Sequence, residues 1–271
     1  MKTVAKLVKD WETKNARNAT KASGISMMAL SLAACGGGGS APAPVVVVEV
    51  VPITSALTIW NDTVAGTTAD DVVTGARIDT VQVFNSGDSI VLGDGNDSLS
   101  ATLNAGTVTP VAMTGVENVM FTVLGDATVD FDNVSGVTSI ISRGSSATLL
   151  VDDIQEIPTS ISINNNTAVQ TFVIKDSAVS GASDSITLNF DGVGGVVNVG
   201  GETDGDGDIE TFTIVASAGA SDLGVGNGFG ADATTVTVKA TAALDLGSTA
   251  QFIASTNFDA STSTADVTAV F

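Results

Sequence analysis

Apolar and polar residues alternate in short runs from Val45 onward, and turn-forming residues separate these runs. The runs are rich in β-branched residues, whereas Asn, Asp and Gly, which tolerate left-handed backbone angles, fill the turns at 85–88, 93–97, 164–166 and 204–208. The pattern predicts an all-β domain of many short strands. The predicted strands are 56–60, 80–84, 118–123, 137–142, 147–151, 160–163, 170–174, 185–190, 196–199, 210–215, 234–239 and 251–254.

Related segments recur along the middle of the chain. Val-Thr-Ser-Ile at 137, Pro-Thr-Ser-Ile at 158, Asp-Ser-Ile-Thr-Leu at 184 and Glu-Thr-Phe-Thr-Ile at 210 begin 21, 26 and 26 residues apart. Units of this size, each with a strand or two and Asn/Gly turns, predict the stacked coils of a parallel β-helix or solenoid. The alternative is an antiparallel β-sandwich, whose strands also follow one another at short intervals.

The first 34 residues differ from the rest in charge and hydropathy. Six Lys and Arg residues stand against Asp10 and Glu12, and an apolar run of 11 residues (24–34) follows. About 20 apolar residues are needed to span a bilayer, so this run fits an export signal better than a transmembrane helix. The alternative is an amphipathic N-terminal helix followed by an unrelated cysteine.

With Cys35 directly after the apolar run and four glycines after Cys35, the segment resembles a bacterial lipoprotein signal. The resemblance implies a signal peptide (1–34), acylation of Cys35, a flexible linker (35–55) and a β-repeat domain (56–271). It also implies a membrane partner through N-terminal acyl chains. Gly36 at the second mature position implies, by analogy with enteric lipoproteins, the outer membrane and cell surface of a bacterium.

Charge and composition exclude several functions. The whole chain has a formal charge of −20, and residues 35–271 hold four basic and 28 acidic residues, which gives −24. Such a chain repels nucleic acid and attracts cations. It contains no His and its single Cys is the predicted lipid site, so Ser-His-Asp, Cys-His and His-zinc chemistry are excluded. We therefore expect no enzymatic activity.

Two acidic turns are candidates for metal binding. In the first, residues 93–99, Asp94, Asn96 and Asp97 surround glycines whose carbonyls can approach a common point, which suits the oxygen ligands of Ca²⁺. This turn resembles one RTX nonapeptide, which implies a ligand role for Asp97 and a buried Leu99. Asp88, or Asp71, could complete the cage.

The second acidic turn alternates Asp204, Asp206 and Asp208 with glycines. This spacing resembles the start of an EF-hand loop, but the glycine and glutamate expected later in that motif are replaced by Ile209 and Val215. A corner calcium site assisted by Glu202 or Glu210 is the prediction. For both turns the alternative is a solvated loop whose carboxylates serve only solubility.

The order of these turns resembles bacterial surface-layer and adhesin-like β-strand-repeat proteins. The resemblance rests on 68–75, 85–90, 93–104 and 115–119. It covers about residues 56–270 as a general sequence pattern more than as residue identity. It implies a lipid-anchored, calcium-stabilised structural or adhesive surface protein that associates with itself or with a surface glycan. The alternative is a polysaccharide-binding or polysaccharide-active β-helix. Residues 256–263 look like another repeat opening, so we expect the chain to continue beyond Phe271 or to meet another subunit there.

Overall fold

The computed structural model describes residues 49–203, 209–223, 233–247 and 255–271. Pro52–Phe271 is one compact unit, so it begins four residues before the predicted domain start. Its described residues form strands, turns and loops without any helix. Accordingly, they contain no helix long and apolar enough to cross a membrane. Residues 1–48, which hold the predicted signal and Cys35, lie outside the described residues.

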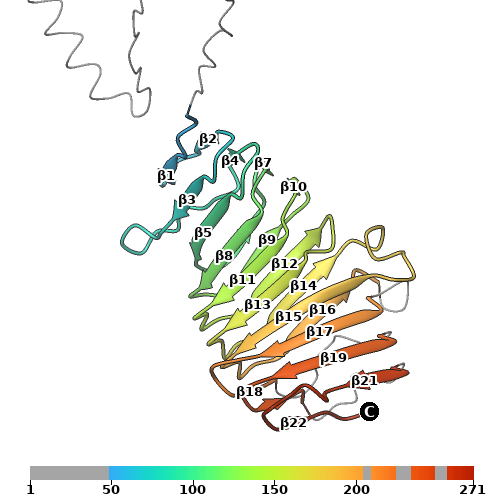
Figure 1. The fold of residues 1–271 in the computed structure, drawn as a ribbon. Coiled ribbons are helices and arrows are strands. Elements are labelled where there is room, and N and C mark those ends of the chain that lie inside the picture. Colours follow the sequence, from blue (N-terminus) through green and yellow to red (C-terminus); the bar gives the residue numbers. More distant parts are fainter. Residues whose placement is uncertain (1–48, 204–208, 224–232, 248–254) are drawn as a thin grey trace, which may run out of the picture. The chain divides into compact units, whose positions relative to one another are not determined.

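The largest element is a ten-stranded sheet whose strands follow one another in chain order (Figure 1). Every strand pair in the described residues is parallel, and the chain returns to this sheet once per coil. The prediction of a parallel β-solenoid is thus confirmed, the solenoid having about eight turns, and the antiparallel sandwich is wrong. The strands are β1 (Thr54–Ala56), β3 (Val72–Gly75), β5 (Ser98–Leu103), β8 (Asn118–Val123), β11 (Ser139–Arg143), β13 (Ser160–Asn164), β15 (Ser185–Asp191), β17 (Thr211–Ala216), β19 (Thr235–Ala240) and β21 (Asn257–Asp259).

Three shorter parallel sheets complete the walls of the coils. The first is β10 (Val134–Ser135), β7 (Ala112–Thr114), β4 (Ser89–Val91) and β2 (Thr63–Ala65). The second is β16 (Val197–Gly201), β14 (Gln170–Ile174), β12 (Leu149–Ile154), β9 (Ala127–Asp130) and β6 (Gly106–Val108). The third is β18 (Ser221–Asp222), β20 (Leu244–Asp245) and β22 (Val267–Thr268).

The core lies inside the coils because buried and partly exposed residues alternate along the strands. In β8, Val119, Phe121 and Val123 are fully buried, while the residues between them face outward. Leu99, expected inside from the RTX-like pattern, is likewise buried. Phe84 of the loop after β3 stacks on Phe121 of β8 with ring centroids 6.3 Å apart, so aromatic packing joins different coils inside the core.

Most predicted strands in the middle of the chain are found, and two near its start are not. Predicted strands 118–123 and 170–174 coincide with β8 and β14. The predicted strand 56–60 is wrong because β1 ends at Ala56 and the backbone then turns, with the Thr58 N–H donating to Asp62 Oδ2 at 2.6 Å. The predicted strand 80–84 is wrong too: it is a loop whose Val83 and Phe84 are buried without strand pairing. Predicted strand 251–254 lies outside the described residues.

Candidate functional site

A carboxylate stands directly before five strands of the ten-stranded sheet (β3, β5, β8, β15 and β17), and those before β3, β5, β8 and β17 bond to the preceding coil. The latter four, the corner carboxylates, are Asp71, Asp97, Glu117 and Glu210. Each accepts a backbone N–H from the equivalent residue of the preceding coil. The donors are Ile53 to Asp71 (2.6 Å), Asp71 to Asp97 (2.6 Å), Asp97 to Glu117 (2.7 Å) and Asp184 to Glu210 (2.8 Å). The corner thereby satisfies donors that would otherwise be buried without partners.

Asp97 differs from the other corner carboxylates in having a buried oxygen without a partner. Its side chain is fully buried, Oδ1 accepts the Asp71 N–H, and Oδ2 has no hydrogen-bond partner among the described residues. Burial raises the pKa of Asp97; the Asp71 N–H opposes this shift, and the charges of the nearby carboxylates Asp71, Glu117 and Asp70 add to it. A buried carboxylate in this state needs a proton or a cation.

The glycines of this turn allow close approach around Asp97. Gly95 has φ +141°, and a Cβ there would lie 2.7 Å from Ala69 O and 2.8 Å from Asp97 Oδ1. Gly93 has φ +98°, and its Cβ would lie 2.6 Å from Thr67 O. Only glycine fits at either position, which explains the Gly-x-Gly spacing that the sequence displays.

The structure does not gather the other predicted ligands of this turn around Asp97. Asp88 is buried before β4, where its two oxygens accept the N–H groups of Asp62 and Asn85, each at 2.9 Å. Burial raises the pKa of Asp88, and these two hydrogen bonds oppose the shift. Asp94 and Asn96 are exposed, and Asn96 Oδ1 accepts a hydrogen bond from Asn118 Nδ2 at 2.9 Å. Asp204, Asp206 and Asp208 lie outside the described residues.

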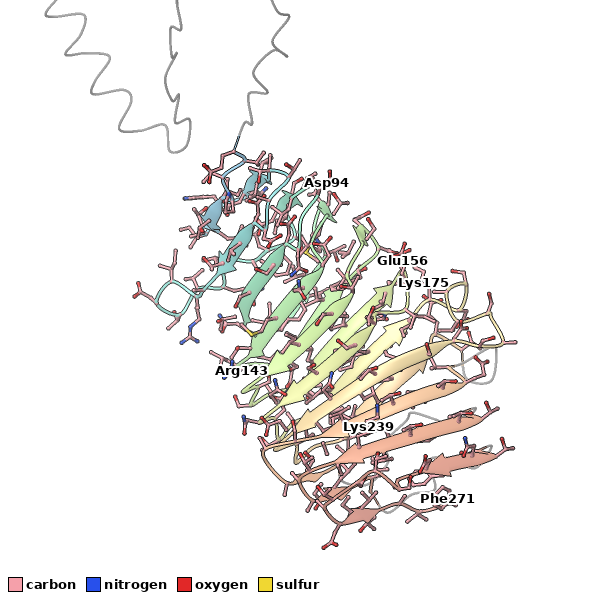
Figure 2. All side chains as sticks on the ribbon, viewed as in Figure 1. Asp94, Arg143, Glu156, Lys175, Lys239 and Phe271 are labelled. Carbon is pink, nitrogen blue, oxygen red and sulfur yellow. The ribbon has the colours of Figure 1, made fainter. Side chains whose placement is uncertain are left out.

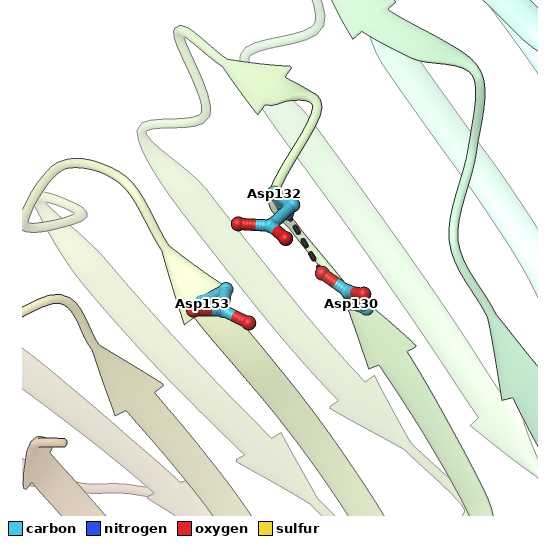
Figure 3. A group of neighbouring side chains, drawn as sticks. All are labelled: Asp130, Asp132 and Asp153. Carbon is cyan, nitrogen blue, oxygen red and sulfur yellow. Dashed lines mark hydrogen bonds between the residues drawn. The ribbon is translucent and has the colours of Figure 1, made fainter.

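A different acidic cluster, missed by the sequence interpretation, lies beside the second sheet. Asp130 ends β9, Asp132 follows it in a loop, and Asp153 belongs to β12 (Figure 3). One oxygen from each lies within 4.8 Å of the others, so the three carboxylates could hold a metal ion. The Asp132 N–H donates to Asp130 Oδ1 at 2.9 Å. The available sequence signal was acidic residues at or near the ends of β9 and β12, but only the register, with Asp152 opposite Asp130, brings these two strands together.

The ammonium of Lys175 already supplies a positive charge to this cluster. Its Nζ lies 2.5 Å from Asp153 Oδ1, 3.1 Å from Asp132 Oδ1 and 3.6 Å from Glu202 Oε1. The hydrogen bond to Lys175 lowers the pKa of Asp153, and the bonds to Asp153 and Asp132 raise the pKa of Lys175. A metal ion at this position would have to displace the ammonium.

Local backbone irregularity aims Asp153 at Lys175. The pairing of β12 with β14 shifts between Val151 and Ile154, which is a β-bulge, and Asp153 has φ +56°, a conformation uncommon for a residue other than glycine. The Lys175 N–H donates to Ile154 O at 2.9 Å, which fixes the lysine backbone next to Asp153. Side-chain exposures are 28% for Lys175 and 25% for Asp153.

The sequence interpretation also missed a buried polar network at another corner. Asn166 Nδ2 donates to Ser142 Oγ at 2.8 Å, and Ser142 Oγ donates to Gln170 Oε1 at 2.7 Å. Asn166 Oδ1 accepts the Ser145 N–H at 2.8 Å. These side chains link successive coils and are buried, so the Asn-rich turn at 164–166 contributes to the structure beyond changing the chain direction.

No protein-family model matches this chain, and no curated protein or solved structure is significantly similar to it.

Proposed function

We propose that this protein is a lipid-anchored structural or adhesive β-solenoid of a bacterial cell surface, stabilised by Ca²⁺ bound at Asp97. The unpartnered, buried Oδ2 of Asp97, close to three further carboxylates, carries this proposal. Ca²⁺ favours carboxylate and carbonyl oxygens in adaptable geometry, and a divalent cation relieves the repulsion among these carboxylates. Because Asp97 accepts a hydrogen bond from the coil before and donates one to the coil after it, an ion there stabilises the stack.

A structural role also agrees with where the basic residues lie. Arg77, Arg143, Lys175 and Lys239 are the four basic residues after Cys35, and they belong to different parts of the fold. Arg143 ends β11 and Lys239 lies in β19, whereas Lys175 follows β14 of another sheet (Figure 2). This scatter favours a structural protein over a polysaccharide-active enzyme, which would need basic and acidic groups in one groove.

The calcium proposal is tested by unfolding the purified full chain in a chelator and in millimolar Ca²⁺. We expect Ca²⁺ to raise the unfolding temperature; a concentration of 100 times Kd corresponds to about 2.7 kcal/mol of stabilisation. Asp97→Asn keeps Oδ1 as an acceptor and replaces Oδ2 with an amide NH₂, so this variant should lose the Ca²⁺ response. In the chelator it should be at least as stable as the unmodified protein, because one buried negative charge is removed.

The matched control is Asp266→Asn, which removes one charge at an exposed position in the last described coil. This variant should respond to Ca²⁺ as the unmodified protein does. Unfolding that is insensitive to Ca²⁺, or an Asp97→Asn variant that still responds fully, would rule out calcium at Asp97.

The anchor is tested separately by mass spectrometry of the mature N-terminus after expression in a Gram-negative bacterium. We expect cleavage before Cys35, acyl chains on that cysteine and partition of the protein into detergent. Cys35→Ser should yield an unacylated protein that partitions into the aqueous phase. An uncleaved, unacylated native chain would contradict the proposed localisation.

A further inference from the structure

Lys175, Asp153 and Glu202 stand together at the ends of neighbouring strands, β14, β12 and β16. Nζ of Lys175 lies 2.5 Å from Asp153 Oδ1, and Glu202 Oε1 lies 3.6 Å from the same Nζ. Glu202 also interacts with the Asp153 carboxyl. An amine, the carboxyl that it contacts and a second carboxyl are therefore assembled by three successive coils.

We propose that Lys175 and Asp153 condense into an intramolecular amide that covalently joins two neighbouring coils. A bond forms between Lys175 Nζ and Asp153 Cγ, and one Asp153 oxygen leaves as water. Two of the three ammonium protons leave with that oxygen, and the third stays on the amide nitrogen. The two charges cancel, and no oxidant, reductant or other reactant is required.

The fold holds the Lys175 amine and the Asp153 carboxylate in fixed contact, which is the main requirement of this condensation. Lys175 is tied to β12 by its backbone hydrogen bond to Ile154, and the bulge with φ +56° at Asp153 holds the carboxylate toward the amine. Reacting groups held in this way reach effective molarities of about 10⁵–10⁸ M, which favours an amide that free amines and carboxylates in water do not form. A β-bulge that re-aims a side chain and a left-handed non-glycine residue are both features found at functional sites.

Glu202 has the role of proton carrier in this step. Because it lies near Nζ and interacts with the Asp153 carboxyl, it can accept a proton from the amine and deliver one to the leaving oxygen. The ion pair keeps Asp153 and Lys175 mainly in their charged forms, so the neutral reactants are a small fraction of molecules. The amide consequently accumulates slowly, after folding, and remains because amides hydrolyse slowly.

The proposal is independent of calcium at Asp97, and mass spectrometry of the full chain, incubated at neutral pH in a chelator, tests it. We expect an intact mass lower by one water. Trypsin should fail to cut after Lys175, and a Glu-specific protease that cuts after Glu156 should then release a branched peptide joining the Asp153 and Lys175 segments.

Three variants define the assignment. Lys175→Arg keeps the positive charge without the amine and should show no loss of water. Glu202→Gln should lower the cross-linked fraction at a fixed time by about tenfold or more. Asp132→Asn, which alters the other close carboxylate, should still cross-link. An unmodified protein that retains its full sequence mass after prolonged incubation would overturn the proposal, as would a cross-link to Asp132. Cross-linking in Glu202→Gln at an unchanged rate would overturn the role of Glu202.

Discussion

Asp97 directly precedes β5 and Asp153 lies within β12, and their surroundings shift the pKa values of the two carboxyls in opposite directions. Asp97 is fully buried close to other carboxylates, and this burial raises its pKa. Asp153 is partly exposed and bonded to an ammonium, which lowers its pKa. The position of a residue in the coil, more than its chemical type, thus decides whether its negative charge opposes or supports folding.

In a chelator, the pH dependence of stability should reveal the raised pKa of Asp97. The folded protein holds this proton more tightly than the unfolded chain, whose Asp pKa is near 3.8. The stability contributed by protonated Asp97 is therefore complete below 3.8 and is lost as pH rises through the folded pKa. The contribution of Asp153 has the opposite sign: it is present above 3.8 and is lost as pH falls through the lowered pKa.

Comparison of the unmodified protein with Asp97→Asn isolates the first effect, since Asp153 is common to both. Urea unfolding between about pH 4 and 8 should show the unmodified protein losing stability relative to the variant as pH rises. Stability profiles of the two proteins that stay parallel over this pH range would contradict a buried Asp97 with a raised pKa.

At the scale of strands, alternation of inward and outward residues was sufficient to locate β8 and β14, where every inward position except Gln170 is apolar. The same pattern failed at 80–84. Val83 and Phe84 belong to a loop and are both buried, and neighbouring loop residues need not alternate between inward and outward positions. The corner carboxylates have a readable local signal, an acidic residue directly before a strand, as in Asp97-Ser98-Leu99. The cluster around Lys175 has no such signal, because it depends on register and on a bulge between coils.

One strand offers a direct measure of core packing. Phe121 of β8 is fully buried against Phe84, so Phe121→Ala should lower the free energy of unfolding by about 3–5 kcal/mol. Thr122, its neighbour, faces outward from the same strand, and Thr122→Ala should change stability by no more than about 0.5 kcal/mol. Urea unfolding of the two variants checks the pair; equal losses would mean that the inward and outward faces are assigned incorrectly.

At the scale of the whole unit, each coil contacts mainly the coils before and after it, so stability is a sum of neighbour terms. The last described coil illustrates this. Its inward residues Phe258, Ala260 and Val267 are only partly buried, whereas Val236 and Val238 of the preceding coil are fully buried. Phe271 packs edge-on against Phe258 with ring centroids 4.9 Å apart, which covers part of this apolar surface.

The corner carboxylates give the stack a direction in time as well as in space. Each corner carboxylate accepts a hydrogen bond from the coil before it. The backbone N–H groups of Ile53, Asp71, Asp97 and Asp184 therefore have their acceptors in residues that lie later in the chain. A polypeptide is synthesised from its N-terminus, so at these four corners each coil completes the hydrogen bonds of the coil made before it. We therefore expect the solenoid to grow vectorially, with each added coil stabilising its predecessor.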